Sequence, residues 1–237
     1  MKSKDNTKDN KSKYYQYQEQ FFGIPERISL RIRRKMFDSL MKLAKPSDQT
    51  TILDVGVTCD RRQDSNFFEK FYPYTHRITA IGMEDGSFLE KDFPGLKFFK
   101  VDGTSLPFPD KSFDLAVSFA TIEHVGSRQR QKSFVDELCR VSRECCFTTP
   151  NRWHPLEFHT VIPMIHWLPP RVFRWILRWI GRDFYAQEEN LNLLSQKEIL
   201  RMLPSDKVVR VEHFRFFGVV SNLLIFIKNP SGPSGKA

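Results

Sequence analysis

Short apolar runs alternate with segments of helical or turn character through the middle of the chain. The apolar runs fall at 51–56, 78–82, 97–101, 113–119 and 144–149. Ahead of the last run, the segment 127–141 (SRQRQKSFVDELCRV) repeats Phe134, Leu138 and Val141 at helical spacing. Strands that alternate with helices predict a parallel sheet with both faces covered.

Two further apolar runs lie close together near the C-terminus. They are VVRVEHFRFFG at 208–218 and SNLLIFIKN at 221–229, with only Val219 and Val220 between them. So short a connection predicts an antiparallel hairpin. We therefore expect an α/β fold in which five parallel strands are followed by a late hairpin.

An amphipathic helix is expected ahead of the first strand, from about Pro25 to Lys45. Pro25 suits a first helical position, and Pro46 directly follows the expected end. The apolar residues of this segment fall on one face, and lysines and arginines supply much of the rest.

The two ends of the chain differ in composition from the part between them. Residues 1–13 are rich in Lys, Asn, Asp and Ser and predict a disordered basic tail. Residues 230–237 are typical of a flexible tail. No internal repeat or linker divides residues 14–229, which we expect to form one domain with a cap segment at about 150–190.

The net charge of +9 is unevenly placed along the sequence. Residues 1–45 carry twelve Lys and Arg against five Asp and Glu, so seven of the nine net charges lie there. Such a charge attracts phosphate on a nucleic acid or on a membrane surface. A solvated tail and an ordinary helix face explain it equally well.

Composition excludes several classes of protein. With 40% hydrophobic residues and 14% aromatic residues, the 237-residue chain can bury a sizeable core. Its four cysteines show neither metal-ligand spacing nor a disulfide framework, which favours a reducing, cytoplasmic compartment. The polar start does not predict a secretory signal, and no run of about 18 apolar residues predicts a transmembrane helix.

Polar and acidic residues follow each of the five predicted parallel strands. Ligands of open α/β sheets bind outside the carboxyl ends of the strands, where these residues would converge. Strand ends are also surface positions, which are polar in most proteins. In strand order the residues are Asp54, Gly56, Thr58 and Asp60; Glu84 and Asp85; Asp102 and Gly103; Glu123 and His124; Asn151 and Arg152.

Within this pattern, the segment 51–149 resembles the class I S-adenosylmethionine-dependent methyltransferases, in particular the methyltransferase type 11-like, small-molecule and lipid branch. ILDVG resembles the first motif of that family, and VDGTSLPFPDKSFDLAVSFATIEHV is similar to the branch over its whole length. The resemblance implies S-adenosyl-L-methionine as cofactor. It also implies a three-layer, Rossmann-like, seven-stranded and mostly parallel sheet with a C-terminal antiparallel hairpin.

The resemblance assigns roles to the strand ends. Gly56, which lacks a Cβ, lets the backbone pass close to the amino-acid end of the cofactor. Glu84 or Asp85 would accept hydrogen bonds from the ribose hydroxyls, and Asp102 from the adenine amine. The cofactor-binding residues expected on this basis are Asp54, Gly56, Thr58, Asp60, Glu84, Asp85, Asp102, Gly103, Thr104 and Glu123.

The loop after the first strand departs from the family pattern, because Thr58 and Asp60 stand where two further glycines are usual. Either these side chains contact the cofactor, Thr58 at its carboxylate and Asp60 at its ammonium, or they block it. The first alternative predicts a working site and the second a degenerate one.

Histidine is the side chain best suited by pKa to remove a proton from a methyl acceptor. His124 follows Glu123 just past the fourth strand, where the resemblance places the methyl group, and is the candidate catalytic residue. The alternative is that these two residues only shape the pocket.

A second cluster of polar residues follows the fifth strand. The spacing H-x-x-E-x-H from His154 does not match the helical i, i+4 pair typical of zinc sites, so no metal is expected. The segment is expected to form a lid over the substrate, or else a cap whose His and Glu residues only pair with each other. The candidate substrate contacts are Asn151, Arg152, Glu157 and His159.

An Arg- and Trp-rich helix is predicted at 171–182, within a stretch from 158 to 182 that contains no acidic residue. Trp and Arg on an apolar helix suit the headgroup zone of an anionic membrane, although a packing helix with solvated arginines has the same pattern. Stacking of nucleic-acid bases ranks lower, because no pattern of a nucleic-acid-binding module accompanies the tryptophans.

The sequence therefore predicts a methyltransferase acting on a small acceptor that is lipophilic or membrane-linked, in the cytoplasm at the inner face of a membrane. The alternative is a non-catalytic peripheral membrane or scaffold protein with a degenerate cofactor loop on the same fold.

Overall fold

Seven strands form one mixed sheet in the computed structural model, which describes residues 26–228, with side chains from residue 29. The strand order is β3-β2-β1-β4-β5-β7-β6, and only the pairs β5–β7 and β7–β6 are antiparallel. This confirms the predicted fold class. The strands are β1 (Ile52–Val55), β2 (Ile78–Gly82), β3 (Lys97–Lys100), β4 (Phe113–Phe119), β5 (Ser142–Pro150), β6 (Val208–Phe216) and β7 (Val219–Lys228).

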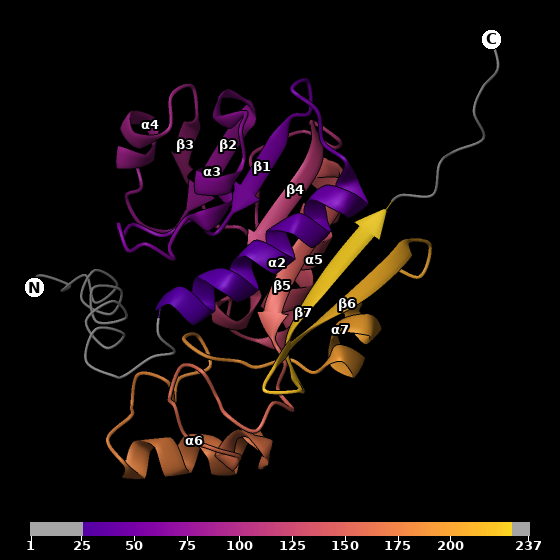
Figure 1. Cartoon of the computed structure of the whole chain (residues 1–237). Helices are drawn as coiled ribbons and strands as arrows, with labels where there is room; N and C mark the ends of the chain where they lie inside the picture. The colour runs from indigo at the N-terminus through magenta and orange to yellow at the C-terminus, as the bar shows by residue number, and fades with distance from the viewer. Residues whose placement is uncertain (1–25, 229–237) are drawn as a thin grey trace, which may run out of the picture.

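Helices cover both faces of the sheet and complete three layers (Figure 1). Side chains of α2, α3 and α4 share one buried core with the sheet, and those of α5 and α7 share the other. The predicted tails at 1–13 and 230–237 lie outside the described residues. The helices are α2 (Glu26–Ala44), α3 (Phe67–Phe71), α4 (Phe88–Asp92), α5 (Arg128–Val141), α6 (Pro170–Trp179) and α7 (Gln196–Met202), with 3₁₀ turns at Thr75–Arg77, Ile122–His124 and Ile165–Trp167.

The alternation of side chains along β1 decides which residues meet which helices. Leu53 and Val55 belong to the core beneath α5, whereas Ile52 belongs to the core beneath α2 and α3. Because successive side chains of a strand point to opposite faces, Asp54 lies on the same face as Ile52. The sequence thus directs a buried carboxylate toward α3.

The C-terminal hairpin forms as predicted, but its turn lies two residues earlier than expected. Phe217 and Gly218 make the turn, with φ of +47° and +80°, and β7 already begins at Val219. A two-residue type I′ turn requires positive φ at both positions. Glycine adopts that conformation readily, whereas Val219 and Val220 are β-branched and favour a strand.

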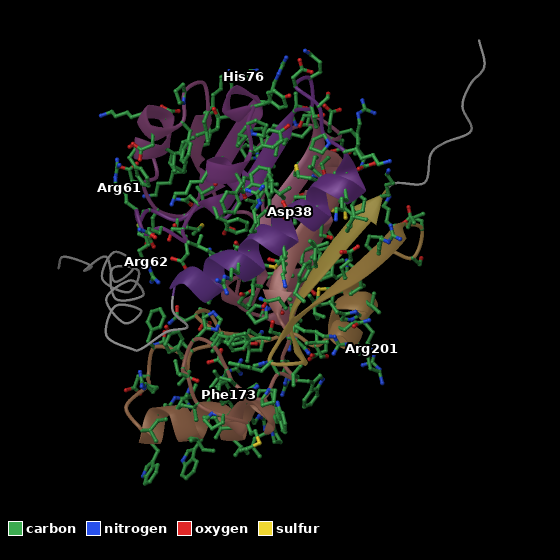
Figure 2. The ribbon with its side chains drawn as sticks, in the orientation of Figure 1. Asp38, Arg61, Arg62, His76, Phe173 and Arg201 are labelled. Carbon is green, nitrogen blue, oxygen red and sulfur yellow. The ribbon has the colours of Figure 1, made fainter. Side chains whose placement is uncertain are left out.

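The cap predicted at about 150–190 lies beyond the carboxyl ends of β1, β4 and β5, with α6 on its outer side (Figure 1). The cap has a small core of its own, which includes Phe173, Leu177 and Tyr185. Figure 2 shows Phe173 on the side of α6 that faces the rest of the protein. The predicted helix 171–182 is shorter than expected, because the chain turns at Gly181 with φ +74°.

Candidate active site

A cavity of about 280 Å³ opens at the carboxyl edge of the sheet, between the β1 loop, α2, α3 and the cap. It lies where the strand order reverses between β1 and β4, the usual ligand position in an open α/β sheet. Of the predicted site residues, those that line it are Asp54, Gly56, Thr58, Asp60, Glu123, His124 and His159.

Gly56 makes the turn at the end of β1. Its φ is +102°, and the backbone N–H groups of Gly56 and Val57 both donate to the carbonyl of Ile81, at 2.9 and 3.1 Å. A Cβ added at Gly56 would lie 2.2 Å from Oγ1 of Thr121. The close approach that requires glycine here is therefore to the loop after β4, within the protein itself.

Asn66 holds the loop in which Thr58 and Asp60 replace the expected glycines. The Thr58 N–H donates to Asn66 Oδ1 at 2.9 Å, and Asn66 Nδ2 donates back to the Thr58 carbonyl at 3.0 Å. Asp60 Oδ1 accepts from the N–H of Arg62 at 3.1 Å. Both replacements are thus engaged in the bonding of the loop, while both residues still border the cavity.

Two buried carboxyl groups face each other in the wall of the cavity. Asp54 is 5% exposed and Glu69, on α3, is 1% exposed. Apart from Asp54, neither oxygen of Glu69 has a hydrogen-bonding partner. Burial, and for Asp54 also repulsion from Glu69, raises the pKa of both groups, so the pair favours a shared proton or a cationic partner. Glu69 was not among the predicted site residues, because it lies inside a run of aromatic residues.

The residues predicted to hold the ribose and adenine do not border this cavity. Glu84 Oε2 accepts from the Cys59 thiol at 2.6 Å, and Asp85 Oδ1 accepts from the N–H of Ser87 at 2.9 Å. Asp102 accepts from Thr104 and forms an ion pair of 2.9 Å with Arg130. Burial opposes ionisation of Asp102, but these bonds hold its pKa below the usual range. Gly103 is packed between Phe134 and Val55.

Four polar side chains gather where the cap meets the loop after β4. His124 Nδ1 lies 2.6 Å from the carbonyl of Asn190, and the His124 and His159 rings meet edge to face at 4.8 Å. His159 Nδ1 lies 2.7 Å from Glu157 Oε1, and Glu157 Oε2 accepts from the Thr160 N–H. Glu123 Oε2 accepts from Thr149 Oγ1 at 3.0 Å.

The electrostatics of this group follow from burial and mutual contact. Burial raises the pKa of Glu123 to about 7 and lowers that of His124 to about 3. Burial would also raise the pKa of Glu157, but His159 outweighs it and holds it at about 2. Burial opposes the charged form of His159, but Glu157 outweighs it and raises the pKa of His159. These contacts favour a protonated His159 beside Glu157 and a neutral His124.

Two of the four candidate substrate contacts lie elsewhere. The amide of Asn151 donates to the carbonyl of Val220 at 3.0 Å, and Arg152 reaches the Leu168 carbonyl at 3.3 Å. Neither residue borders the cavity, whereas His159 does, with Glu157 buried behind it. The sheet and the cap therefore both contribute side chains to the cavity. Of the predicted substrate contacts, the cap contributes His159, and not Asn151 or Arg152.

Comparison with known proteins agrees with this architecture. Residues 66–145 match the model of a family described as a methyltransferase domain. The resemblance to class I methyltransferases that the sequence predicts is therefore confirmed for this part of the chain. Among curated proteins no sequence matches it significantly.

Solved structures share the fold of this chain at low sequence identity. The 1,6-didemethyltoxoflavin-N1-methyltransferase of Burkholderia thailandensis, with bound 1,6-didemethyltoxoflavin and S-adenosylhomocysteine, has a TM-score of 0.57 at 13% identity. The match covers 84% of this chain and 79% of that protein's chain. The N-methyltransferase NodS of Bradyrhizobium japonicum, in complex with S-adenosylhomocysteine, has a TM-score of 0.53 at 14% identity. The match covers 84% of this chain and 88% of the NodS chain.

A third structure shows that the fold also occurs in an enzyme named for a different reaction. The [4+2]-cyclase SpnF matches with a TM-score of 0.55 at 13% identity, covering 84% of this chain and 81% of its own. The reaction must therefore be argued from the side chains around the cavity and not from the fold.

Proposed function

We infer that the protein transfers a methyl group from S-adenosyl-L-methionine to a small acceptor held beneath the cap. The observation that carries this proposal is the buried pair Asp54 and Glu69, which borders the cavity at the switch point of the sheet. Two facing carboxyl groups without full hydrogen bonding suit a cation. The cofactor offers its ammonium group, and Asp54 and Glu69 are the residues that would bind it.

The residues around the cavity fit the rest of such a reaction. When bound, S-adenosyl-L-methionine would supply an electrophilic methyl group, which an acceptor lone pair would displace from the sulfonium to leave a neutral thioether. Glu123, His124 and His159 also border this cavity, where they can orient the acceptor. Burial lowers the pKa of His124 to about 3, so removal of the acceptor's proton by His124 remains a prediction.

The cofactor proposal is tested by equilibrium binding of S-adenosylhomocysteine to the full chain. We expect binding to weaken about 30-fold, or about 2 kcal/mol, in Asp54→Asn, because one of two counter-charges is lost. Asp206→Asn removes a carboxylate that pairs with Lys207 at 2.9 Å, away from the cavity, and should leave binding unchanged. Absence of binding at millimolar ligand would reject the enzyme and favour the non-catalytic scaffold.

For the class of acceptor, the outer face of α6 favours a membrane-linked molecule. On α6, Val172, Trp175 and Trp179 follow one another at helical spacing and are exposed, the last two by 62% and 79%, and the exposed Leu168 lies just ahead of the helix. Arg171 and Arg178 are exposed on the same helix. Trp and Arg around an apolar stripe suit the headgroup zone of an anionic bilayer. None of the described helices is long and apolar enough to cross a bilayer, so the contact would be peripheral.

Sedimentation with vesicles containing anionic lipid tests this surface. We expect Trp175→Ala with Trp179→Ala to lower vesicle binding at least tenfold, about 1.4 kcal/mol, because both rings lose their burial in the interface. Phe217→Ala removes an equally exposed aromatic ring from the hairpin turn and serves as the control. Equal vesicle binding by both variants and the wild type would contradict a docking role for α6.

A further inference from the structure

Glu123, His124 and His159 bring three metal-ligating side chains together from two distant segments of the chain. One ligand atom from each residue lies within 4.8 Å of the other two. Glu123 and His124 belong to the 3₁₀ turn after β4, and His159 belongs to the cap. The H-x-x-E-x-H spacing in the sequence joins His154, Glu157 and His159. It therefore did not predict that His159 lies beside Glu123 and His124.

The partners of the two imidazoles orient them as metal-binding histidines are usually oriented. His159 Nδ1 is bonded to the Glu157 carboxylate at 2.7 Å, and His124 Nδ1 to the Asn190 carbonyl at 2.6 Å. A carboxylate or backbone carbonyl on one ring nitrogen fixes the ring and makes the other nitrogen a better ligand. The nitrogen that would bind an ion is therefore Nε2 in both residues.

Glu123 supplies an independent sign of a ligand. Its side chain is fully buried, and Oε1 has no hydrogen-bonding partner, although Oε2 accepts from Thr149. An unpartnered carboxylate oxygen inside a protein is costly unless a positive charge compensates it. A metal ion between the three residues would provide that charge.

We propose that Glu123, His124 and His159 bind one divalent transition-metal ion at the acceptor end of the cavity. Two imidazoles and a carboxylate suit Zn²⁺, Co²⁺, Mn²⁺ or Fe²⁺ and are poor ligands for Mg²⁺, which prefers oxygen alone. Bonds of about 2.1 Å place neighbouring ligand atoms roughly 3.4 Å apart in a tetrahedral site, so the three side chains would move closer together around the ion. Three protein ligands leave a coordination position for a further molecule.

The open position indicates what the ion does. An acceptor hydroxyl bound to the ion would lose its proton to water more readily, and its oxygen would become a better nucleophile. This role rests on the proposed methyl transfer, whereas the binding of the ion does not. It predicts an acceptor with an oxygen that can coordinate a metal.

The binding is tested on chelator-treated full chain without cofactor, by calorimetric titration with Zn²⁺ and Mg²⁺ and by the ligand-field absorption of Co²⁺. We expect one Zn²⁺ or Co²⁺ per chain, with a dissociation constant of about 10 µM or tighter, and no uptake of Mg²⁺ in that range. Glu123→Gln and His159→Gln should weaken binding about 100-fold, and Glu157→Gln at least tenfold through the orientation of His159. His213→Gln removes an exposed histidine that contacts Gln196 and should change nothing.

Circular dichroism of each variant separates loss of the site from loss of the fold. Stoichiometric uptake that is unchanged in Glu123→Gln and His159→Gln, or no uptake at about 1 mM metal, would overturn the proposal. Binding of S-adenosylhomocysteine is measured with chelator present. A chain that binds Co²⁺ but no S-adenosylhomocysteine would reject methyl transfer alone, and the reverse result would reject the metal site alone.

Discussion

Gly56→Ala is expected to lower the free energy of unfolding by at least about 3 kcal/mol and to abolish binding of S-adenosylhomocysteine. Two effects combine at this position. The backbone has φ +102°, which an L side chain rarely adopts, and the new Cβ would lie 2.2 Å from Oγ1 of Thr121. The loop after β1 and the loop after β4 would have to move apart. Chemical denaturation and ligand titration measure the two consequences separately.

Gly181→Ala separates conformational strain from steric overlap. Gly181 has φ +74°, but no atom lies within 4 Å of its missing Cβ, so the substitution should cost only about 1 kcal/mol. Thr121→Gly, introduced together with Gly56→Ala, should restore part of the lost stability, because it removes the overlapping atoms. Equal destabilisation by the two alanine substitutions would show that contact with Thr121 is unimportant.

The sequence predicted those features that depend on the local order of residues along the chain. Alternation of apolar runs and helices gave the parallel sheet, and the two late strands gave the hairpin. The turn of that hairpin was placed too late, because Phe217 is not a usual turn residue and its positive φ is imposed by the paired strands. The turn after β1 was predictable from Gly56, because glycine readily adopts the positive φ that this turn requires.

The contacts that complete the candidate site were not predictable, because they join residues far apart in the sequence. Glu69 meets Asp54 only when α3 packs on the sheet, and His159 meets His124 only when the cap folds over the loop after β4. Asn66 is an ordinary polar residue in the sequence, but its φ of +47° lets its amide hold the loop at Thr58. A single sequence does not show which of its distant residues come into contact in the folded protein.

Roles assigned by resemblance also depend on contacts that the sequence does not show. Asp102 was expected to accept from an adenine amine, and in the structure it pairs with Arg130. Glu84 was expected near a ribose, and it accepts from Cys59. These cofactor roles remain predictions, and they require the side chains to exchange these partners for the ligand.

Glu69→Gln is expected to stabilise the protein at pH 8, by about 1–2 kcal/mol, while weakening its affinity for S-adenosylhomocysteine. Burial raises the pKa of both Asp54 and Glu69. Above the ordinary carboxyl pKa of about 4, the folded protein therefore holds more protons on this pair than the unfolded chain does. Stability then falls as the pH rises, until the pair has lost its proton in the folded state as well. A glutamine amide can donate to Asp54 and removes one of the two buried charges.

The pH dependence distinguishes this explanation from a general gain in packing. The advantage of Glu69→Gln over the wild type should grow between pH 5 and pH 8, as measured by urea denaturation at each pH. Glu189→Gln removes an exposed carboxylate, and its stability should depend on pH in the same way as that of the wild type.

If the stability of Glu69→Gln also depended on pH in the same way as that of the wild type, Asp54 and Glu69 would not share a proton in the folded protein. If stability rose but ligand affinity stayed the same, Glu69 would not contribute to binding the ammonium group. Higher stability together with weaker binding is the result expected if the two carboxyl groups serve to bind a cationic ligand. Their burial is unfavourable in the free protein and is compensated only when the cation is bound.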